Sequence, residues 1–288
     1  MQAADVQPYR APDPELLSIN TATLWESCNL KEAAQLLQMH GIRGIAPWRN
    51  RIAEVGTAEA RRIIDDCGLA VSGLCRGGMF PGADEAARRA AIEDNLRAVD
   101  EAASLGARCL VMVCGGLPHG SKDLVGARNM VRDGLGAILG HARASQVPVA
   151  IEPLHPMTAA DRSVINTLRQ ALDLCDELDP DCTGALGVAV DAYHVWWDPE
   201  LQSQIERAGH KRLHAFHICD WLVPTADLVF DRGMMGDGVI DLPQMRAWME
   251  AAGYRGMHEV EIFSKNNWWK RPADEVLSVC KSRHQSVC

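Results

Sequence analysis

The sequence predicts a single (β/α)8 barrel, and three observations lead to this fold class. The 288 residues contain no linker-like or low-complexity segment, and 47% of them are hydrophobic, which suits one large domain with a sizeable core. Short apolar runs alternate eight times with amphipathic stretches, as parallel strands covered by helices do. The GxGxxG motif that usually follows the first strand of an open doubly wound sheet is absent from the sequence.

Apolar runs and capping residues give the expected boundaries of the elements. The predicted strands are residues 16–24, 42–48, 69–75, 109–114, 147–154, 186–190, 213–218 and 257–263. The predicted helices are residues 29–41, 57–67, 84–106, 121–141, 161–174, 198–209, 241–253 and 272–284. Residues 1–15 are polar and contain proline, so we expect an N-terminal arm followed by one barrel domain at 16–288.

The composition argues against several classes of protein. The net charge is −9, which argues against a nucleic-acid partner because phosphate binding needs a basic surface. Several of the ten cysteines lie inside apolar runs and no CxxC pair is present, so we expect reduced core thiols and no structural zinc site. The N-terminus is polar, and no apolar run approaches the length of a membrane span. We therefore expect a cytoplasmic protein without a membrane partner.

Acidic and imidazole side chains end four consecutive predicted strands: Glu152, Asp191, His217 and Glu261. The carboxyl ends of barrel strands meet at one face, where the active site of such a barrel lies. A single acid at a strand end is often only a helix cap or an ion-pair partner, but four on neighbouring strands favour a site. Three buried carboxylates would repel each other without a cation. Mn²⁺ or Mg²⁺ suits this donor set best, with Co²⁺ or Zn²⁺ as alternatives.

Five motifs surround these strand ends: IEP at 151–153, VDAYH at 190–194, HAFHICD at 214–220, GDGVID at 236–241, and a stretch from GY at 253–254 to EVEIF at 259–263. Together they resemble the motifs of the xylose isomerase-like TIM barrels in the sugar phosphate isomerase/epimerase superfamily. The resemblance covers essentially the whole chain. Each motif is weakly specific alone, but the set is specific to the superfamily.

The resemblance implies that the four strand-end residues bind one divalent metal ion. It also implies that Glu152 and Glu261 are catalytic: one removes the proton next to a substrate carbonyl, the metal stabilises the enediolate, and the other returns a proton. Which glutamate is the base stays open. Glu259 lies two residues before Glu261 on the same side of the strand, so we expect it deeper in the barrel, and it is the substitute ligand if Glu261 is not one.

The family pattern and the strand ends suggest five substrate-binding residues: His194, Arg232, His155, Trp48 and Arg76. His194 follows Asp191 at DxxH spacing, with a role as a hydrogen-bond partner of the ligands as the alternative. Arg232 lies in a glycine-containing loop, whose shape favours function over a plain surface cation. His155 can contact substrate or only a neighbouring loop. For Trp48 and Arg76, shaping a sugar pocket and ordinary packing are equally supported.

The resulting hypothesis is an isomerase or epimerase of a keto-sugar or related polyol carbonyl compound. The alternative is a lyase, because the same residues can remove a proton and then expel a β-substituent, as inosose dehydratases, dehydroshikimate dehydratases and 3-oxo-glycoside lyases of the superfamily do. A non-catalytic sugar-binding subunit is a third hypothesis. No clear phosphate-binding signature is present, which favours an unphosphorylated substrate. Relatives in the superfamily imply a homo-oligomer, either a dimer or a tetramer.

Overall fold

Nine parallel strands form the central sheet of the computed structural model, which describes residues 10–288. Their order in the sheet is β3-β2-β1-β11-β8-β7-β6-β5-β4, and the sheet curls into a nearly closed barrel. The predicted barrel fold is therefore confirmed. The strands are β1 (Leu17–Asn20), β2 (Gly44–Ala46), β3 (Ala70–Val71), β4 (Leu74–Gly78), β5 (Leu110–Val113), β6 (Val149–Ile151), β7 (Leu186–Asp191), β8 (Leu213–Ile218) and β11 (His258–Val260).

The third predicted strand is interrupted, and its two parts belong to β3 and β4, which lie at opposite ends of the strand order. The structure divides residues 69–75 into β3 and the start of β4, with Ser72 and Gly73 between them. The Ser72 N–H donates to the Ile45 carbonyl at 3.0 Å, and the Cys75 N–H donates to the Pro47 carbonyl at 3.0 Å. β2 and the residue after it therefore bond to the chain on both sides of the break, and β3 and β4 form the two ends of the sheet.

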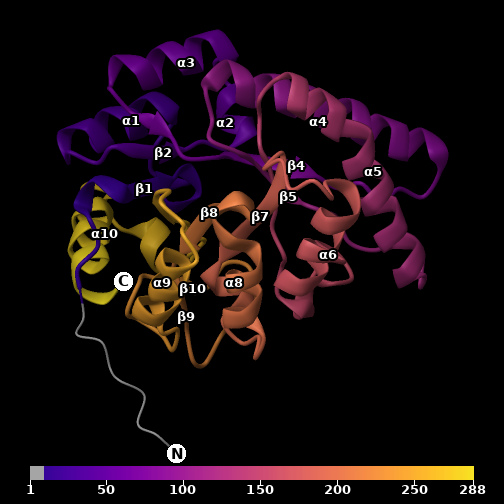
Figure 1. Ribbon diagram of the computed structural model, residues 1–288. Helices are drawn as coiled ribbons and strands as arrows, with labels where there is room; N and C mark the ends of the chain where they lie inside the picture. The colour runs from indigo at the N-terminus through magenta and orange to yellow at the C-terminus, as the bar shows by residue number, and fades with distance from the viewer. Residues whose placement is uncertain (1–9) are drawn as a thin grey trace, which may run out of the picture.

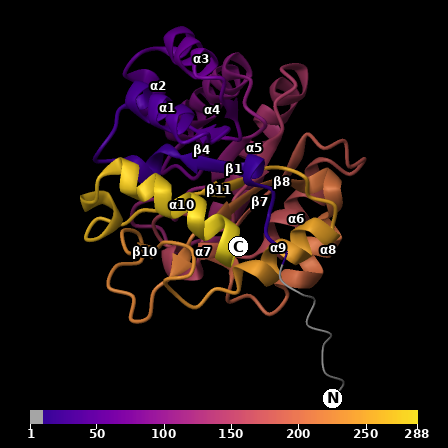
Figure 2. The ribbon, with the colours of Figure 1, turned by 90° about the vertical axis from the view of Figure 1, so that its left-hand side faces the viewer.

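The described part of the chain has ten helices; the longer ones lie around the outside of the strands (Figures 1 and 2), and the short helix α7 directly follows β7 at the barrel mouth. Their first turns follow the predicted caps at several points; Asn29 and Glu32 form a capping box, and the Asp84 and Asp241 side chains cap two further helices. The helices are α1 (Leu30–Met39), α2 (Arg49–Ala53), α3 (Thr57–Asp66), α4 (Glu85–Leu105), α5 (Leu124–Ala144), α6 (Leu168–Leu178), α7 (Ala192–Val195), α8 (Leu201–Arg212), α9 (Leu242–Ala251) and α10 (Ala273–Val287).

The ring of helices closes where the last helix meets the first. Figure 2 shows α10 running beside the N-terminal elements. His40, which follows α1, lies 2.8 Å from Asp274 at the start of α10, and Lys281 donates to the His40 carbonyl at 2.6 Å. The N-terminal and C-terminal parts of the chain therefore hold each other in the closed barrel.

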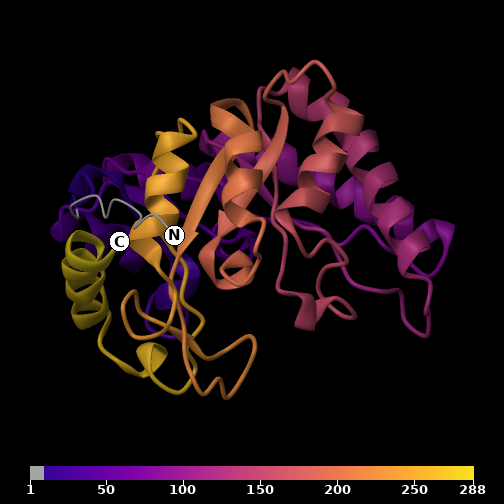
Figure 3. The same ribbon diagram turned by 60° about the horizontal axis from the view of Figure 1, so that its bottom comes forward.

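The segments that follow β8 and β11 project together on one side of the barrel (Figure 3). The first contains a small antiparallel pair, β9 (Asp220–Trp221) and β10 (Arg232–Gly233). The Arg232 N–H donates to the Phe263 carbonyl at 2.9 Å, and the Lys265 N–H donates to the Phe230 carbonyl at 3.0 Å. These bonds fix one loop on the other over the carboxyl ends of the strands.

Several predicted boundaries were wrong because loops take the backbone hydrogen bonds that strands or helices would use. The strand predicted at 16–24 ends at Asn20, whose side chain caps a 3-10 turn, Thr21–Leu24. The helix predicted from Asp161 begins at Leu168, because the Asn166 amide bonds the carbonyls of Leu154 and Ser163 and holds residues 159–166 in a non-helical path. One error has the opposite cause: the strand predicted to end at Cys75 continues to Gly78, because Gly77 and Gly78 pair with β5.

Other predictions concern the termini, the thiols and membranes. Nine residues of the predicted arm at 1–15 lie outside the described residues, and Pro14–Leu16 form a 3-10 turn. All ten cysteines are free in the structure, and seven are buried, as expected for core thiols. Within residues 10–288, no helix combines the length and the apolar character needed to cross a bilayer.

A buried amide holds β4 in place, and this gives a test of the fold. Asn95 on α4 accepts from the Gly78 N–H at 2.6 Å and donates to the Gly78 carbonyl at 2.8 Å. We expect Asn95→Ala to lower the free energy of unfolding by about 3 kcal/mol, because two buried backbone groups lose their partner. Urea denaturation followed by circular dichroism measures this. Asn50→Ala on the exposed side of α2 is the control, and a change in Asn95→Ala as small as the control's, within about 0.5 kcal/mol, would refute the prediction.

Candidate metal centre and active site

The four predicted strand-end residues meet inside the barrel mouth. One ligand atom from each lies within 4.8 Å of the corresponding atoms of the others, and all four residues are buried: Glu152, Asp191, His217 and Glu261. Asp191 ends β7 and His217 lies in β8, while Glu152 and Glu261 directly follow β6 and β11. These four strands are neighbours in the sheet, so strand order alone brings the side chains together.

Below this cluster, Glu259 occupies the barrel interior. It accepts from the Asn20 amide at 2.8 Å and from the Ser72 hydroxyl at 2.8 Å, and it lies 3.5 Å from His217 Nε2. The other ring nitrogen, His217 Nδ1, lies 2.8 Å from Glu152 Oε1. The imidazole thus presents Nδ1 to the cluster and Nε2 to Glu259. Glu259 is the deeper acid, and the structure places Glu261 in the cluster.

Carboxylates on both sides of His217 determine its charge. Burial alone would lower the pKa of His217, but the charge of Glu259 and the hydrogen bond to Glu152 raise it well above the ordinary value. A carboxylate behind a ligating imidazole is the usual way in which a protein orients that ligand. The arrangement of His217 and Glu259 therefore fits a metal ligand better than an isolated core histidine.

Arg232 supplies a second positive charge to the cluster. Its Nη1 lies 3.0 Å from Asp191 Oδ2 and 3.1 Å from Glu261 Oε2, and its Nη2 lies 3.1 Å from His194 Nε2. The guanidinium also stacks 4.6 Å from the centre of the Tyr193 ring. The structure therefore places Arg232 and His194 beside the predicted ligands, within reach of a substrate held there.

The cluster drives the pKa values of two carboxyl groups apart. Burial raises the pKa of Glu261 to about 8, against the opposing charge of Arg232. Burial also acts on Asp191, but the charges of Arg232 and His217 hold its pKa below the ordinary value. Neighbouring groups whose pKa values are pushed in opposite directions are typical of catalytic sites.

The two predicted substrate-contacting histidines adjoin each other. Burial lowers the pKa of His194 to about 3, although Asp191 opposes the shift, so His194 is neutral near pH 7. The His155 N–H donates to His194 Nδ1 at 3.2 Å, and the His155 ring stacks on Trp221 at 4.8 Å. His155 thus lies one layer outside the cluster, between His194 and the loop after β8.

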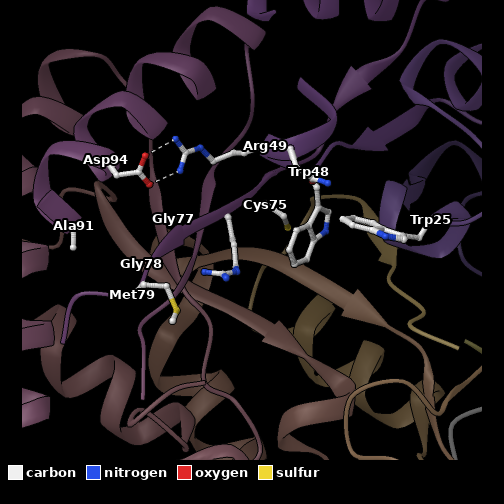
Figure 4. A pocket seen from close by; sticks show the side chains of 11 residues that line it. Trp25, Trp48, Arg49, Cys75, Gly77, Gly78, Met79, Ala91 and Asp94 are labelled. Atoms are coloured by element: carbon white, nitrogen blue, oxygen red, sulfur yellow. Dashed lines mark hydrogen bonds and ion pairs between the residues drawn. The ribbon is translucent and has the colours of Figure 1, made fainter. Parts of the chain in front are cut away.

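A cavity of about 440 Å³ lies at the ends of β2 and β4 (Figure 4). Residues that line it include Trp25, Trp48, Arg49, Cys75, Arg76 and Met79. It adjoins the metal site through Asn20, because Trp48 Nε1 donates to Asn20 Oδ1 at 2.9 Å and Asn20 Nδ2 lies 3.4 Å from Cys75 Sγ. Trp48 and Arg76, both predicted to bind substrate, therefore line a cavity whose wall is connected to Glu261 of the cluster through Asn20.

Asn20 is the site residue that sequence reasoning missed. Its amide also donates to Glu261 Oε1 at 3.0 Å, so it connects the barrel interior with the cluster. The prediction ran a strand through this position. An asparagine after the apolar Ile19 was the available signal, since asparagine favours caps and turns over strand interiors.

A comparison with family models supports this description. The model described as "Xylose isomerase-like TIM barrel" matches residues 32–283. The chain belongs to this family. The crystal structure of protein SMc04130 from Sinorhizobium meliloti 1021 is 58% identical in sequence, with a TM-score of 0.93, and covers 96% of this chain and 99% of that one.

More distant relatives share the barrel fold. The crystal structure of the IolI protein with a bound zinc atom is 20% identical, with a TM-score of 0.79, and covers 93% of this chain and 95% of that one. The inosose isomerase of Bacillus velezensis is 22% identical over 289 residues, which cover 94% of this chain and 96% of the relative.

The cluster has the donors that a divalent cation needs. Three carboxylates and one imidazole converge within 4.8 Å, and Glu259 lies behind the imidazole. Because the raised pKa values of Glu261 and His217 reflect bound protons, a metal ion must compete with protons for these ligands.

We expect the affinity for Mn²⁺ to fall as the pH decreases from about 8.5 to about 6.5, because Glu261 becomes protonated over this range. Folded-state protonation of Glu261 stabilises the metal-free protein at low pH, and this contribution is lost as the pH rises through about 8. The increase in melting temperature on adding Mn²⁺ should therefore grow with pH.

Calorimetric titration in buffers of different ionisation enthalpy measures the affinity and the protons released. An affinity independent of pH would contradict this expectation.

Proposed function

We propose that this protein is a divalent-metal-dependent isomerase or epimerase of a keto-sugar or related polyol carbonyl compound. The observation that carries the proposal is the convergence of two glutamates, one aspartate and one histidine from four neighbouring strands. Membership of the xylose isomerase-like family and the similarity to an inosose isomerase support the same class of reaction.

The metal ligands are Glu152, Asp191, His217 and Glu261 in this proposal, with Mn²⁺ or Mg²⁺ as the favoured ion. A divalent ion at this place supplies stabilisation of the negative charge that develops on a substrate carbonyl oxygen. Asp191 stays ionised beside Arg232, and His217 is oriented by Glu259. Both are ligands without a role in proton transfer.

Proton transfer is assigned to Glu152 and Glu261. They approach the cluster from β6 and β11, which β7 and β8 separate in the sheet. A substrate bound between them can lose the proton next to its carbonyl to one carboxylate and receive a proton from the other. The opposite face yields an epimer and the neighbouring carbon yields an isomer.

Arg232 and His194 bind the substrate oxygens in this scheme. Arg232 is buried against the ring of Tyr193 and reaches two of the ligands, so its position is fixed before substrate arrives. Neutral His194 can exchange hydrogen bonds with a hydroxyl group without adding charge to the site. His155 and Trp48 support these contacts from the loop and cavity sides.

We expect Glu152→Gln and Glu261→Gln each to lower the rate of deuterium incorporation into a keto-sugar by at least about 1,000-fold, because each removes a proton-transfer group. Proton NMR measures the incorporation after incubation in D₂O with Mn²⁺ and removal of the metal by chelator. Glu93→Gln on the exposed side of α4 is the control and should exchange like the wild type.

The same experiment separates the competing reactions. Epimerisation or isomerisation gives a deuterated sugar, while β-elimination by the lyase alternative gives an unsaturated carbonyl product that absorbs in the ultraviolet. Wild-type exchange in either glutamine variant would refute the assignment of the two glutamates. Tight Mn²⁺ binding without turnover of any keto-sugar would favour a sugar-binding protein.

A further inference from the structure

Two arginines beside the metal site have no partner of their own. Arg76 in β4 lines the 440 Å³ cavity, and Arg162 lies in the segment between β6 and α6. Both side chains are partly buried. Within residues 10–288, neither guanidinium makes a hydrogen bond or an ion pair with a protein group. Partial burial of a cation without an anionic partner costs free energy, and a bound anion would offset this cost at both positions.

Arg49 lines the same cavity, but its charge is neutralised by two carboxylates. Its Nη1 lies 2.7 Å from Asp94 and its Nε lies 2.7 Å from Glu101, and both contacts are bidentate. Figure 4 shows the pairing of Arg49 with Asp94 at the wall of the cavity. The chain thus pairs one cavity arginine with two carboxylates and leaves Arg76 with none.

Arg76 and Arg162 are close enough for their charges to interact. Burial lowers the pKa of Arg76, and the charge of Arg162 lowers it further, while Glu152 opposes the shift. The charge of Arg162 also contributes to the low pKa of His194.

Backbone contacts place Arg162 next to the cavity wall. The Gly115 N–H donates to the Arg162 carbonyl at 3.0 Å. Gly115 packs against the backbone of Met79, which lines the cavity.

We propose that Arg76 and Arg162 bind a carboxylate carried by the substrate, so that the substrate is a keto-sugar acid instead of a neutral ketose. The inference rests on the proposed function for the carbonyl chemistry. Guanidinium groups match the planar geometry of a carboxylate, and charge-assisted bonds of this kind are strong in a partly buried cavity. The anionic end would lie in the cavity, and the carbonyl end would lie at the cluster.

Sugars that differ only at carbon 6 test this assignment. The probes are D-fructose, D-fructuronate and D-fructose 6-phosphate, and the same three forms of D-tagatose. Calorimetric titration of the Mn²⁺-loaded protein gives each affinity. In at least one series, we expect the acid to bind about tenfold or more tightly than the neutral sugar. Tighter binding of the phosphate form than of the acid in both series would contradict the carboxylate assignment.

Substitutions identify the residues responsible for the preference. Arg76→Met and Arg162→Met should each reduce it to about threefold or less, Arg76→Lys should retain part of it, and the Mn²⁺ affinity should stay the same in all variants. Arg89→Met, exposed on α4, is the control and should behave as the wild type. Equal binding of all forms in both series, or a preference that survives both methionine variants, would overturn the inference.

Deuterium exchange on the same samples separates the two hypotheses. A neutral sugar that exchanges as fast as its acid would support the proposed function and contradict the anion site. An arginine-dependent preference for the acid without exchange of any probe would support the anion site and contradict the isomerase.

Discussion

The balance of charge in the barrel mouth is the constraint on which the rest of the structure depends. Four acidic side chains are buried there, counting Glu259 below the cluster. Buried carboxylates are tolerated only when positive charge and hydrogen bonds compensate them. Arg232 and His217 supply the charge, and Asn20 and Ser72 supply neutral hydrogen bonds. Each of these groups comes from a different part of the chain.

The same contacts that balance the charge also hold the loops over the site in place. Arg232 is delivered by the short strand β10, and its backbone is bonded to Phe263 in the loop after β11. Its guanidinium connects ligands on β7 and after β11. The long segment between β8 and α9 is therefore fixed at Arg232 by both its backbone and its side chain.

The sequence was sufficient for features that depend on local patterns. Apolar runs gave the eight strand positions, and acids at the ends of four of them gave the cluster, because parallel strands place their carboxyl ends on one face. Features that depend on distant partners were not predictable in this way. The path of the chain at Ser72 and Gly73 depends on bonds to Ile45 in β2 and to Pro47 just after it, and the late start of α6 depends on bonds of Asn166 to Leu154. The role of Asn20 depends on glutamates more than 200 positions away in the chain.

The contacts of Asn20 also bear on when the site can assemble. Its single amide touches Glu259 and Glu261, so the first strand of the barrel takes part in a centre completed by the last. During synthesis, β1 leaves the ribosome long before β11. The growing chain therefore has no complete set of ligands to offer a metal ion until its final strand has docked beside its first. The geometry of the four-residue cluster therefore depends on contact between the two ends of the barrel sequence.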